Sequence, residues 1–313
     1  GAGHASIEEK GVKLRKRPFF PRPSRPFPTL KNTDGEYCPH PFTAFIEDDH
    51  CLFLSIMQKI RHITRKFEDL MSAKVIAFAN HKGGVGKTAS TVNVAYCLAK
   101  RKRRVLVVDC DPQGNASLTL GTVSPYEQPR TVANLFTGLS FSAAAVPSKY
   151  EGLDLIPANL NVYATVSTLS NSIKRFFGFR QALDKAALNT YDYILLDCPP
   201  TIEGALLTNA LIITDYIIIP VGVEDTYALS GVSHLIKVAE TLRADTESNL
   251  AIMGVLLTMY DGRNNAAKTI RNVAIGTFGE EMVFRTTIPR NTTLNKAVMS
   301  NLAVCDYDDG CSS

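Results

Sequence analysis

The stretch HKGGVGKTAS, residues 81–90, decides the fold, because it follows a short apolar run and precedes a helix-length segment. Its three glycines leave the backbone free to turn N–H groups inward, around the oxygens of a phosphate. Lys87 would add a positive charge at the outer phosphates, and the Thr88 hydroxyl could bind Mg²⁺. His81 stands where the general pattern GxxxxGK[ST] has its first glycine, but Lys82 and the glycines after it fit the more specific pattern KGGxGK[ST]. The segment therefore predicts a deviant phosphate-binding loop between a strand and a helix.

Apolar runs of strand length recur along the chain around this loop. They lie at 75–80, 105–109, 153–157, 193–197, 216–221 and 251–258, and helix-length segments lie between them at 88–101, 175–189, 227–243 and 265–276. Strands that are apolar almost throughout are buried on both faces, which is typical of a parallel sheet covered by helices. We therefore predict an α/β fold class, with a doubly wound, mainly parallel sheet and ligands at the carboxyl ends of the strands.

Carboxylates follow two of the predicted strands directly. VVDCDPQGNAS, residues 107–117, places Asp109 and Asp111 two positions apart before a proline turn, although such a pair is also common turn chemistry. YILLDCPP, residues 193–200, ends a strand at Asp197, in the Walker B arrangement in which a carboxylate holds Mg²⁺ through water. These side chains point to the same strand-end crevice as the phosphate loop, where they could serve Mg²⁺ and an attacking water.

The N-terminal part differs in composition from the rest. Residues 1–50 contain a Pro-rich basic segment and are expected to form an extended tail, because proline disfavours a helical predecessor. Residues 51–72 space apolar side chains three and four apart, which predicts an amphipathic helix or linker. That helix is expected to pack on its own domain or on a dimer partner, with membrane-surface or nucleic-acid binding as alternatives. Residues 73–313 form the predicted main domain.

Composition limits the functional classes. The net charge is +4 and most of the excess lies in the N-terminal part, so the main domain is not a highly basic nucleic-acid binder overall. No apolar run approaches the roughly 18 residues needed to cross a bilayer, and the first residues lack the apolar core of a secretory signal. Seven scattered cysteines without a CxxC pair favour reduced thiols over a disulfide framework or zinc site. These features predict a cytoplasmic protein.

The motifs also resemble one family specifically. HKGGVGKTASTVNVAYCLA, VLVVDCDPQGNASLTLG, YDYILLDCPPTIEGALLTNAL and IIIPVGVEDTYALSGVSHL are similar to the ParA branch of the ParA/MinD family, and LLTMYDGRNNAA and IPRNTTLNKAV continue the match in order. The resemblance covers residues 74–308. It implies a P-loop ATPase that forms a face-to-face homodimer with ATP and Mg²⁺ and binds DNA nonspecifically. It also implies a ParB-like or adaptor partner that stimulates slow hydrolysis, and a role over the nucleoid in partitioning plasmids or chromosomes or in spacing cargo.

The resemblance assigns roles to individual residues. It implies that Lys82 is a signature lysine that reaches the partner's phosphates, that Asp111 orients the attacking water, and that Asp109 and Asp197 lie near the metal bound by Thr88. The ATP-binding set is completed by the remaining loop residues and by the segment placed at adenine: Gly83, Gly84, Val85, Gly86, Lys87, Ala89, Pro289, Arg290 and Asn291.

Candidates for DNA contact lie further along the chain. Arg263 matches a position that contributes to DNA binding in relatives. Lys268 and Arg271 are three residues apart, so they would share one helix face, and Arg290 follows later. A solvated helix face is the alternative interpretation of these charges.

Four departures from the family pattern qualify the resemblance. Ala89 lacks the second hydroxyl that relatives often have after Lys-Thr, so weaker nucleotide binding is expected. Thr293 replaces a frequent second DNA-binding arginine, and Lys296 with Ala297 replaces a frequent Glu-Ala pair. The sequence ends in CDYDDGCSS where relatives add a further helix. Either the given chain is truncated there, or the protein dispenses with that helix and one face of the sheet lacks its cover.

Three other functions remain as alternatives. A MinD-like positioning ATPase would need an amphipathic helix to bind the membrane, and only residues 51–70 offer one. A redox ATPase would need cluster-ligating cysteines, for which Cys110 and Cys198 are the candidates, although their motifs suggest packing at strand ends. A nucleotide-binding scaffold with little hydrolysis is consistent with Ala89. Direct operator recognition is disfavoured, because no helix-turn-helix precedes the main domain.

Overall fold

A computed structural model describes residues 72–308, apart from 170, 171, 173, 202, 203, 225–228 and 247. The predicted tail at 1–50 and nearly all of the predicted amphipathic helix at 51–72 lie outside the described residues. Both therefore stay predictions.

The described strands form one seven-stranded sheet in the order β3-β4-β2-β5-β1-β6-β7. Every neighbouring pair is parallel except β3 with β4. The bounds are β1 Lys74–Phe78, β2 Val105–Asp109, β3 Val146–Pro147, β4 Leu153–Ile156, β5 Tyr193–Asp197, β6 Tyr216–Gly222 and β7 Ala251–Thr258. The predicted doubly wound, mainly parallel α/β fold is thereby confirmed, and the three central strands β2, β5 and β1 are almost completely buried.

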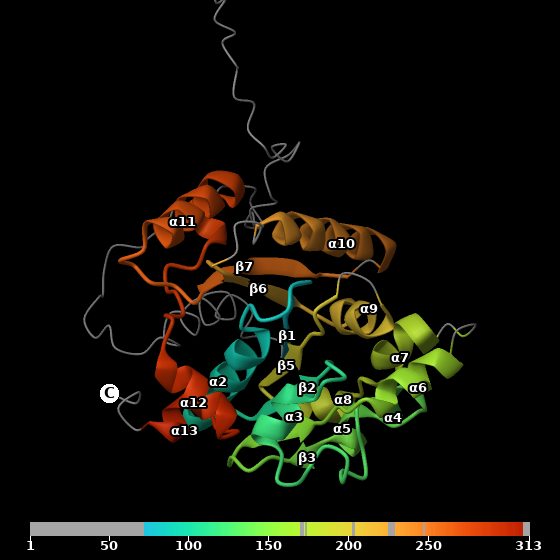
Figure 1. Ribbon diagram of the computed structural model, residues 1–313. Coiled ribbons are helices and arrows are strands. Elements are labelled where there is room, and N and C mark those ends of the chain that lie inside the picture. The colour runs from blue at the N-terminus through green and yellow to red at the C-terminus, as the bar shows by residue number, and fades with distance from the viewer. Residues whose placement is uncertain are drawn as a thin grey trace, which may run out of the picture. The chain divides into compact units, whose positions relative to one another are not determined.

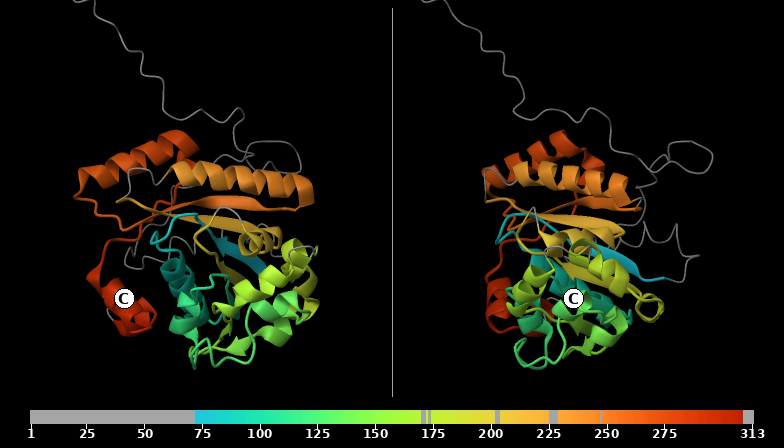
Figure 2. Two further views of the ribbon diagram at one scale, coloured as in Figure 1. Left: turned by 45° about the vertical axis from the view of Figure 1, so that its right-hand side comes forward. Right: turned by 90° about the vertical axis from the view of Figure 1, so that its right-hand side faces the viewer.

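Helices flank the sheet (Figures 1 and 2). Their bounds are α2 Lys87–Lys100, α3 Asn115–Leu120, α4 Ala133–Phe136, α5 Phe141–Ala144, α6 Asn161–Thr168, α7 Lys174–Ala182, α8 Lys185–Thr190, α9 Ala205–Ile212, α10 Ser230–Thr246, α11 Asn265–Phe278, α12 Thr292–Met299 and α13 Val304–Tyr307, with a 3₁₀ turn at Glu280–Met282. The single helix predicted at 175–189 is wrong. The chain leaves the helical conformation at Asp184, whose carboxylate accepts hydrogen bonds from the N–H and the hydroxyl of Ser142.

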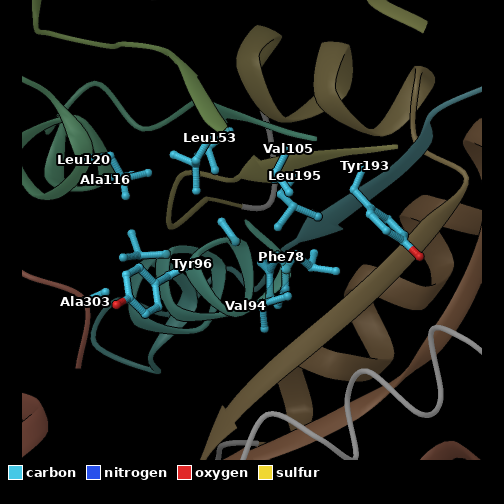
Figure 3. Close-up of a cluster of buried hydrophobic side chains, with 14 of the residues drawn as sticks. Phe78, Val94, Tyr96, Val105, Ala116, Leu120, Leu153, Tyr193, Leu195 and Ala303 are labelled. Atoms are coloured by element: carbon cyan, nitrogen blue, oxygen red, sulfur yellow. The ribbon is translucent and has the colours of Figure 1, made fainter. Parts of the chain in front are cut away.

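A hydrophobic cluster of buried residues lies between α2 and the central strands. It includes Phe78, Val105 and Leu195 of the sheet together with Val94 and Tyr96 of α2 (Figure 3). Each fully buried aliphatic or aromatic side chain of this kind stabilises the fold by about 1.5–3 kcal/mol. The helix that begins at the phosphate loop is therefore anchored along its length.

The C-terminal segment packs on the same helix. Ala303 and Val304 are buried, and Figure 3 places Ala303 beside Tyr96. The Val304 N–H donates to Asn93 Oδ1 at 2.7 Å, and the Ala303 N–H donates to the Tyr150 hydroxyl at 3.0 Å. Residues 303–304 thus cover part of α2.

Candidate phosphate-binding site

The loop between β1 and α2 is fixed at the carboxyl edge of the sheet by contacts with two other strands, β6 and β7. Its start is held by Asn80, which donates from Nδ2 to the Pro220 carbonyl of β6 at 2.7 Å and accepts the Lys82 N–H at 3.1 Å. Its middle is held by Thr258 at the end of β7, whose hydroxyl donates to the Val85 carbonyl at 2.9 Å. The loop is therefore rigid where it leaves the sheet.

The glycines of the loop have distinct functions. Gly84 and Gly86 have φ values of 71° and 83°, a left-handed conformation that favours glycine. A Cβ atom on Gly86 would also lie 3.4 Å from Thr258 Cγ2, whereas one on Gly83 or Gly84 would have no described atom within 4 Å. The loop backbone is thus open at Gly83 and Gly84, whereas at Gly86 it packs closely against Thr258. This geometry fits a cradle for phosphate oxygens.

Lys87 lies at the junction of the loop and α2 with only 7% of its surface exposed. Its Nζ donates to the Lys82 carbonyl at 2.7 Å, so the ammonium group is folded back over the loop. Burial lowers the pKa of Lys87, and the charges of Asp197 and Asp111 partly offset that effect. An ammonium group buried beside the cradle is suited to an anionic ligand, which would compensate for its lost hydration.

Thr88 and Asp197 meet directly beside this lysine. The Thr88 hydroxyl donates to Asp197 Oδ2 at 2.7 Å, and the Thr91 hydroxyl lies 3.4 Å from Oδ1. Burial raises the pKa of Asp197 to about 7, although the hydrogen bond from Thr88 acts in the opposite direction. A hydroxyl and a carboxylate are oxygen donors of the kind that Mg²⁺ prefers, so the residues present fit that ion. Within the described residues, no group of three or more His, Cys, Asp or Glu side chains could hold a metal by itself.

The two aspartates after β2 have different surroundings. Asp109 is fully buried, and its oxygens accept hydrogen bonds from the Asp111 N–H at 3.1 Å, the Ser117 N–H at 2.8 Å and the Ser117 hydroxyl at 2.7 Å. Asp111 is 8% exposed and accepts the Gln113 N–H at 3.0 Å. Asp109 therefore shapes the turn that carries Asp111, and Asp111 is the better candidate to act on a ligand.

The segment assigned to adenine lies at the same edge of the sheet. Pro289 pairs with Tyr260 just beyond β7, and the Arg290 N–H donates to the Tyr260 carbonyl at 3.3 Å. The Arg290 guanidinium forms an ion pair with Glu224, beyond the end of β6. Asn291 caps α12 by accepting the Thr293 N–H at 2.8 Å. The position of Ala89 carries only a methyl group, and its carbonyl accepts a hydrogen bond from Asn93.

The candidate DNA-binding residues lie on and around α11. Lys268 is exposed on α11, while Arg271 donates to the Arg285 carbonyl at 3.4 Å. Arg263 precedes the helix and forms an ion pair with Asp261 at 3.1 Å. Arg290 is likewise paired with Glu224. Acidic neighbours therefore partly neutralise two of the four residues predicted to contact DNA, Arg263 and Arg290.

The cysteines proposed for a redox function are buried. Cys110 and Cys198 have at most 1% of their surface exposed, and burial raises the pKa of both thiols. Their sulfur atoms face backbone carbonyls of their own strands. They pack at the strand ends, as their motifs suggested.

Two contacts of the loop were not anticipated from sequence. Thr258 is recognisable only as the polar residue that ends an apolar strand. The His81 ring fills the space beside Gly231 in the first turn of α10, where a Cβ atom would lie 1.6 Å from His81 Cε1. His81 therefore connects the start of the loop to α10, through a contact that requires glycine at position 231.

Gly231→Ala is expected to destabilise the fold by about 1–3 kcal/mol, because the new methyl group must displace the His81 ring. The ATP affinity should fall with it, since the ring adjoins Lys82. Thermal unfolding and calorimetric titration measure the two effects. Gly276→Ala in α11 is the matched control, since its Cβ would meet no described atom within 4 Å. The double variant His81→Ala/Gly231→Ala should recover stability. Equal behaviour of Gly231→Ala and Gly276→Ala would show that the contact is unimportant.

Known proteins are similar in sequence to the part of the chain that contains this loop. The AAA_31 family model, described as an AAA domain, matches residues 73–252. The chromosome partitioning protein ParA of Caulobacter vibrioides is 35% identical over 241 residues, which cover 76% of this chain and 89% of ParA. The sporulation initiation inhibitor protein Soj of Bacillus subtilis is 37% identical over 235 residues, which cover 75% of this chain and 91% of Soj.

Solved structures share the fold. Cobyrinic acid a,c-diamide synthase from Mycobacterium smegmatis, with bound ADP and magnesium, has a TM-score of 0.63 at 29% identity, covering 77% of this chain and 93% of that one. A variant of Cyanothece McdA in complex with ATP has a TM-score of 0.67 over the same shares at 18% identity, which supports the fold alone. The phosphate loop, the sheet order and these relatives together show that the chain belongs to the ParA/MinD family of P-loop ATPases.

Proposed function

We propose that the chain is an ATP-dependent dimerisation switch that hydrolyses ATP slowly and binds DNA nonspecifically, in order to partition DNA or to position cargo. The observation that carries the proposal is the convergence at one sheet edge of the open glycine loop, the buried Lys87 ammonium and the Thr88–Asp197 pair. The ParA and Soj relatives support a partition or positioning function, and two of the solved neighbours contain ADP or ATP.

The nucleotide is proposed to bind at the loop with its phosphates over Gly83 and Gly84. Lys87 would neutralise phosphate charge, while Thr88 and Asp197 would hold Mg²⁺, directly and through water respectively. Bound Mg²⁺ would supply positive charge that favours the ionised form of Asp197. The segment 289–291 would contact adenine, because it lies just beyond β7, at the same edge of the sheet as the loop.

Dimerisation is attributed to Lys82. The Lys87 ammonium already serves the loop of its own subunit, at 2.7 Å from the Lys82 carbonyl. A second lysine at the start of the same loop is better explained if its side chain completes the phosphate site of the partner subunit. ATP binding would then join two subunits, and hydrolysis aided by Asp111 would separate them.

DNA binding is proposed to depend on the ATP-bound dimer, which doubles the modest basic surface around α11. A ParB-like or adaptor partner would stimulate hydrolysis and release the DNA, and DNA binding would place the protein on the nucleoid. No helix in the described part of the chain is both long and apolar enough to span a bilayer.

Arg263→Ala is expected to weaken binding of the ATP-loaded protein to duplex DNA by about threefold to tenfold and to reduce the salt dependence, because one DNA phosphate is no longer neutralised. Fluorescence anisotropy with ATP and Mg²⁺ measures both quantities. Arg243→Ala, an exposed arginine on α10, is the matched control. Deletion of residues 1–30 tests the basic tail: complete loss of binding on deletion, with no effect of Arg263→Ala, would assign DNA binding to the tail instead.

A further inference from the structure

Two half-buried cysteines lie where the C-terminal segment packs on α2. Cys97 belongs to α2 and Cys305 to α13, and both thiols border the hydrophobic cluster beside α2. Cys110 and Cys198, the other cysteines in the described part of the chain, are at most 1% exposed. Cys97 and Cys305 are therefore the two described cysteines that a small oxidant can reach. The function proposed above makes no use of them.

A hydrogen bond brings the two cysteines close together along α2. The Val304 N–H donates to Asn93 Oδ1 at 2.7 Å, so the residue before Cys305 is docked on this helix. Cys97 is four residues after Asn93, and side chains at that spacing share one helix face, with Cβ atoms about 5–6 Å apart. Cys305 therefore follows a residue that is docked one helical turn from Cys97.

Two tyrosines hold the segment at the same turn of α2. Tyr96, which precedes Cys97, meets the Tyr150 ring edge-on, with 4.9 Å between the ring centres. The Tyr150 hydroxyl donates to Asp306 Oδ2 at 3.1 Å, on the residue after Cys305. Burial raises the pKa of Tyr96, and the charges of Asp306 and Cys305 act in the same direction. The Cys305 sulfur thus lies within electrostatic range of the residue beside Cys97.

We propose that Cys97 and Cys305 form a reversible disulfide when a peroxide oxidises the protein, and that this bond fastens the C-terminal segment to α2. A disulfide joins Cα atoms about 4.4–6.8 Å apart, a span that one helical turn and one residue of chain supply. One thiolate attacks a peroxide oxygen, which forms a sulfenic acid and releases hydroxide. The second thiolate then displaces hydroxide from the sulfenic sulfur, so that two electrons have passed from the thiols to the peroxide. A dithiol reverses the step by exchange and is itself oxidised to a disulfide.

The bond acts on a short segment at the end of the described chain. α13 has only four residues, and hydrogen bonds to Asn93 and Tyr150 hold its start. A covalent tie between Cys97 and Cys305 closes a loop of about 200 residues, and constraining such a loop in the unfolded chain stabilises the fold. Oxidation therefore anchors the C-terminal segment more firmly on α2. This inference does not rest on the nucleotide-dependent switch.

The test treats the reduced full-length chain with hydrogen peroxide, alkylates the remaining thiols and maps disulfide-linked peptides by mass spectrometry. The linked peptides should join Cys97 to Cys305 within one chain, and dithiothreitol should separate them. Cys38, Cys51 and Cys311, which lie outside the described residues, are the competing partners. A link from Cys97 or Cys305 to one of these, or a link between two chains, would overturn the proposal. Oxidation of both thiols to sulfinic or sulfonic acid without any link would overturn it as well.

Stability and amide exchange provide a second, independent readout. Peroxide should raise the melting temperature of the unmodified chain by about 5–10 °C and slow hydrogen exchange of the Val304 amide about tenfold. Cys97→Ser and Cys305→Ser should each abolish both shifts, while the reduced proteins melt within about 2 °C of the unmodified chain. Cys38→Ser/Cys311→Ser is the matched control and should keep both shifts. Shifts that persist in Cys97→Ser or Cys305→Ser, or that are lost in the control, would contradict the assignment.

Discussion

Replacing Lys87 by alanine is expected to lower ATP affinity by about 10-fold to 100-fold in a calorimetric titration. Lys87 is only 7% exposed and its ammonium group is folded over the loop, where it would meet the phosphates. A hydrogen bond to a charged group contributes about 1.5–3 kcal/mol, and every 1.4 kcal/mol changes the affinity tenfold.

The control for this variant is Lys100→Ala, at the opposite end of the same helix. It removes the same charge and should leave ATP affinity unchanged. Circular dichroism must show that both variants are folded. Unaltered ATP affinity in folded Lys87→Ala would mean that the phosphates bind elsewhere.

Asp111→Ala is expected to slow ATP hydrolysis by about 100-fold or more while ATP affinity stays within a few-fold, as measured by phosphate release and by calorimetry. A positioned carboxylate contributes about 10²–10⁴ to a reaction in which a water must be oriented and deprotonated. Asp111 lies close enough to the Thr88–Asp197 pair for its charge to help raise the pKa of Asp197, yet its side chain is not part of the loop that would hold the phosphates.

Asp245→Ala, an exposed aspartate on α10, is the matched control and should hydrolyse ATP at the normal rate. Equal hydrolysis by Asp111→Ala and the control would remove Asp111 from the mechanism. Hydrolysis that is undetectable in the unmodified chain, even with DNA present, would favour a nucleotide-binding scaffold.

The sheet was predictable from sequence to within a residue or two, because its central strands are buried on both faces and so contain almost only apolar residues. β2, β5 and β7 have the predicted bounds. β3 was not predicted, since two residues with one proline carry no periodic pattern. The break between α7 and α8 was missed because it depends on hydrogen bonds between Asp184 and Ser142, which are 42 residues apart.

The candidate site was likewise predictable only where its residues follow one another in sequence or end neighbouring strands. A motif specifies residues that follow one another, such as Gly86, Lys87 and Thr88, and strand order brings Asp197 to them. The Thr258–Val85 hydrogen bond joins residues 173 positions apart, and no local pattern predicts it. The three hydrogen bonds received by Asp109 likewise depend on how the following turn folds back. The ion pair between Asp261 and Arg263 was within reach of sequence analysis, because the two are only two residues apart.

The central claim is that ATP joins two subunits through Lys82, and the mass of Asp111→Ala in solution tests it most directly. Size-exclusion chromatography with light scattering should show twice the 34.2 kDa chain mass with ATP and Mg²⁺, and the single chain mass with ADP. Lys82→Ala/Asp111→Ala should stay at the single chain mass with ATP, although it still binds the nucleotide. A monomer of Asp111→Ala at saturating ATP, or a dimer that persists without Lys82, would contradict the account.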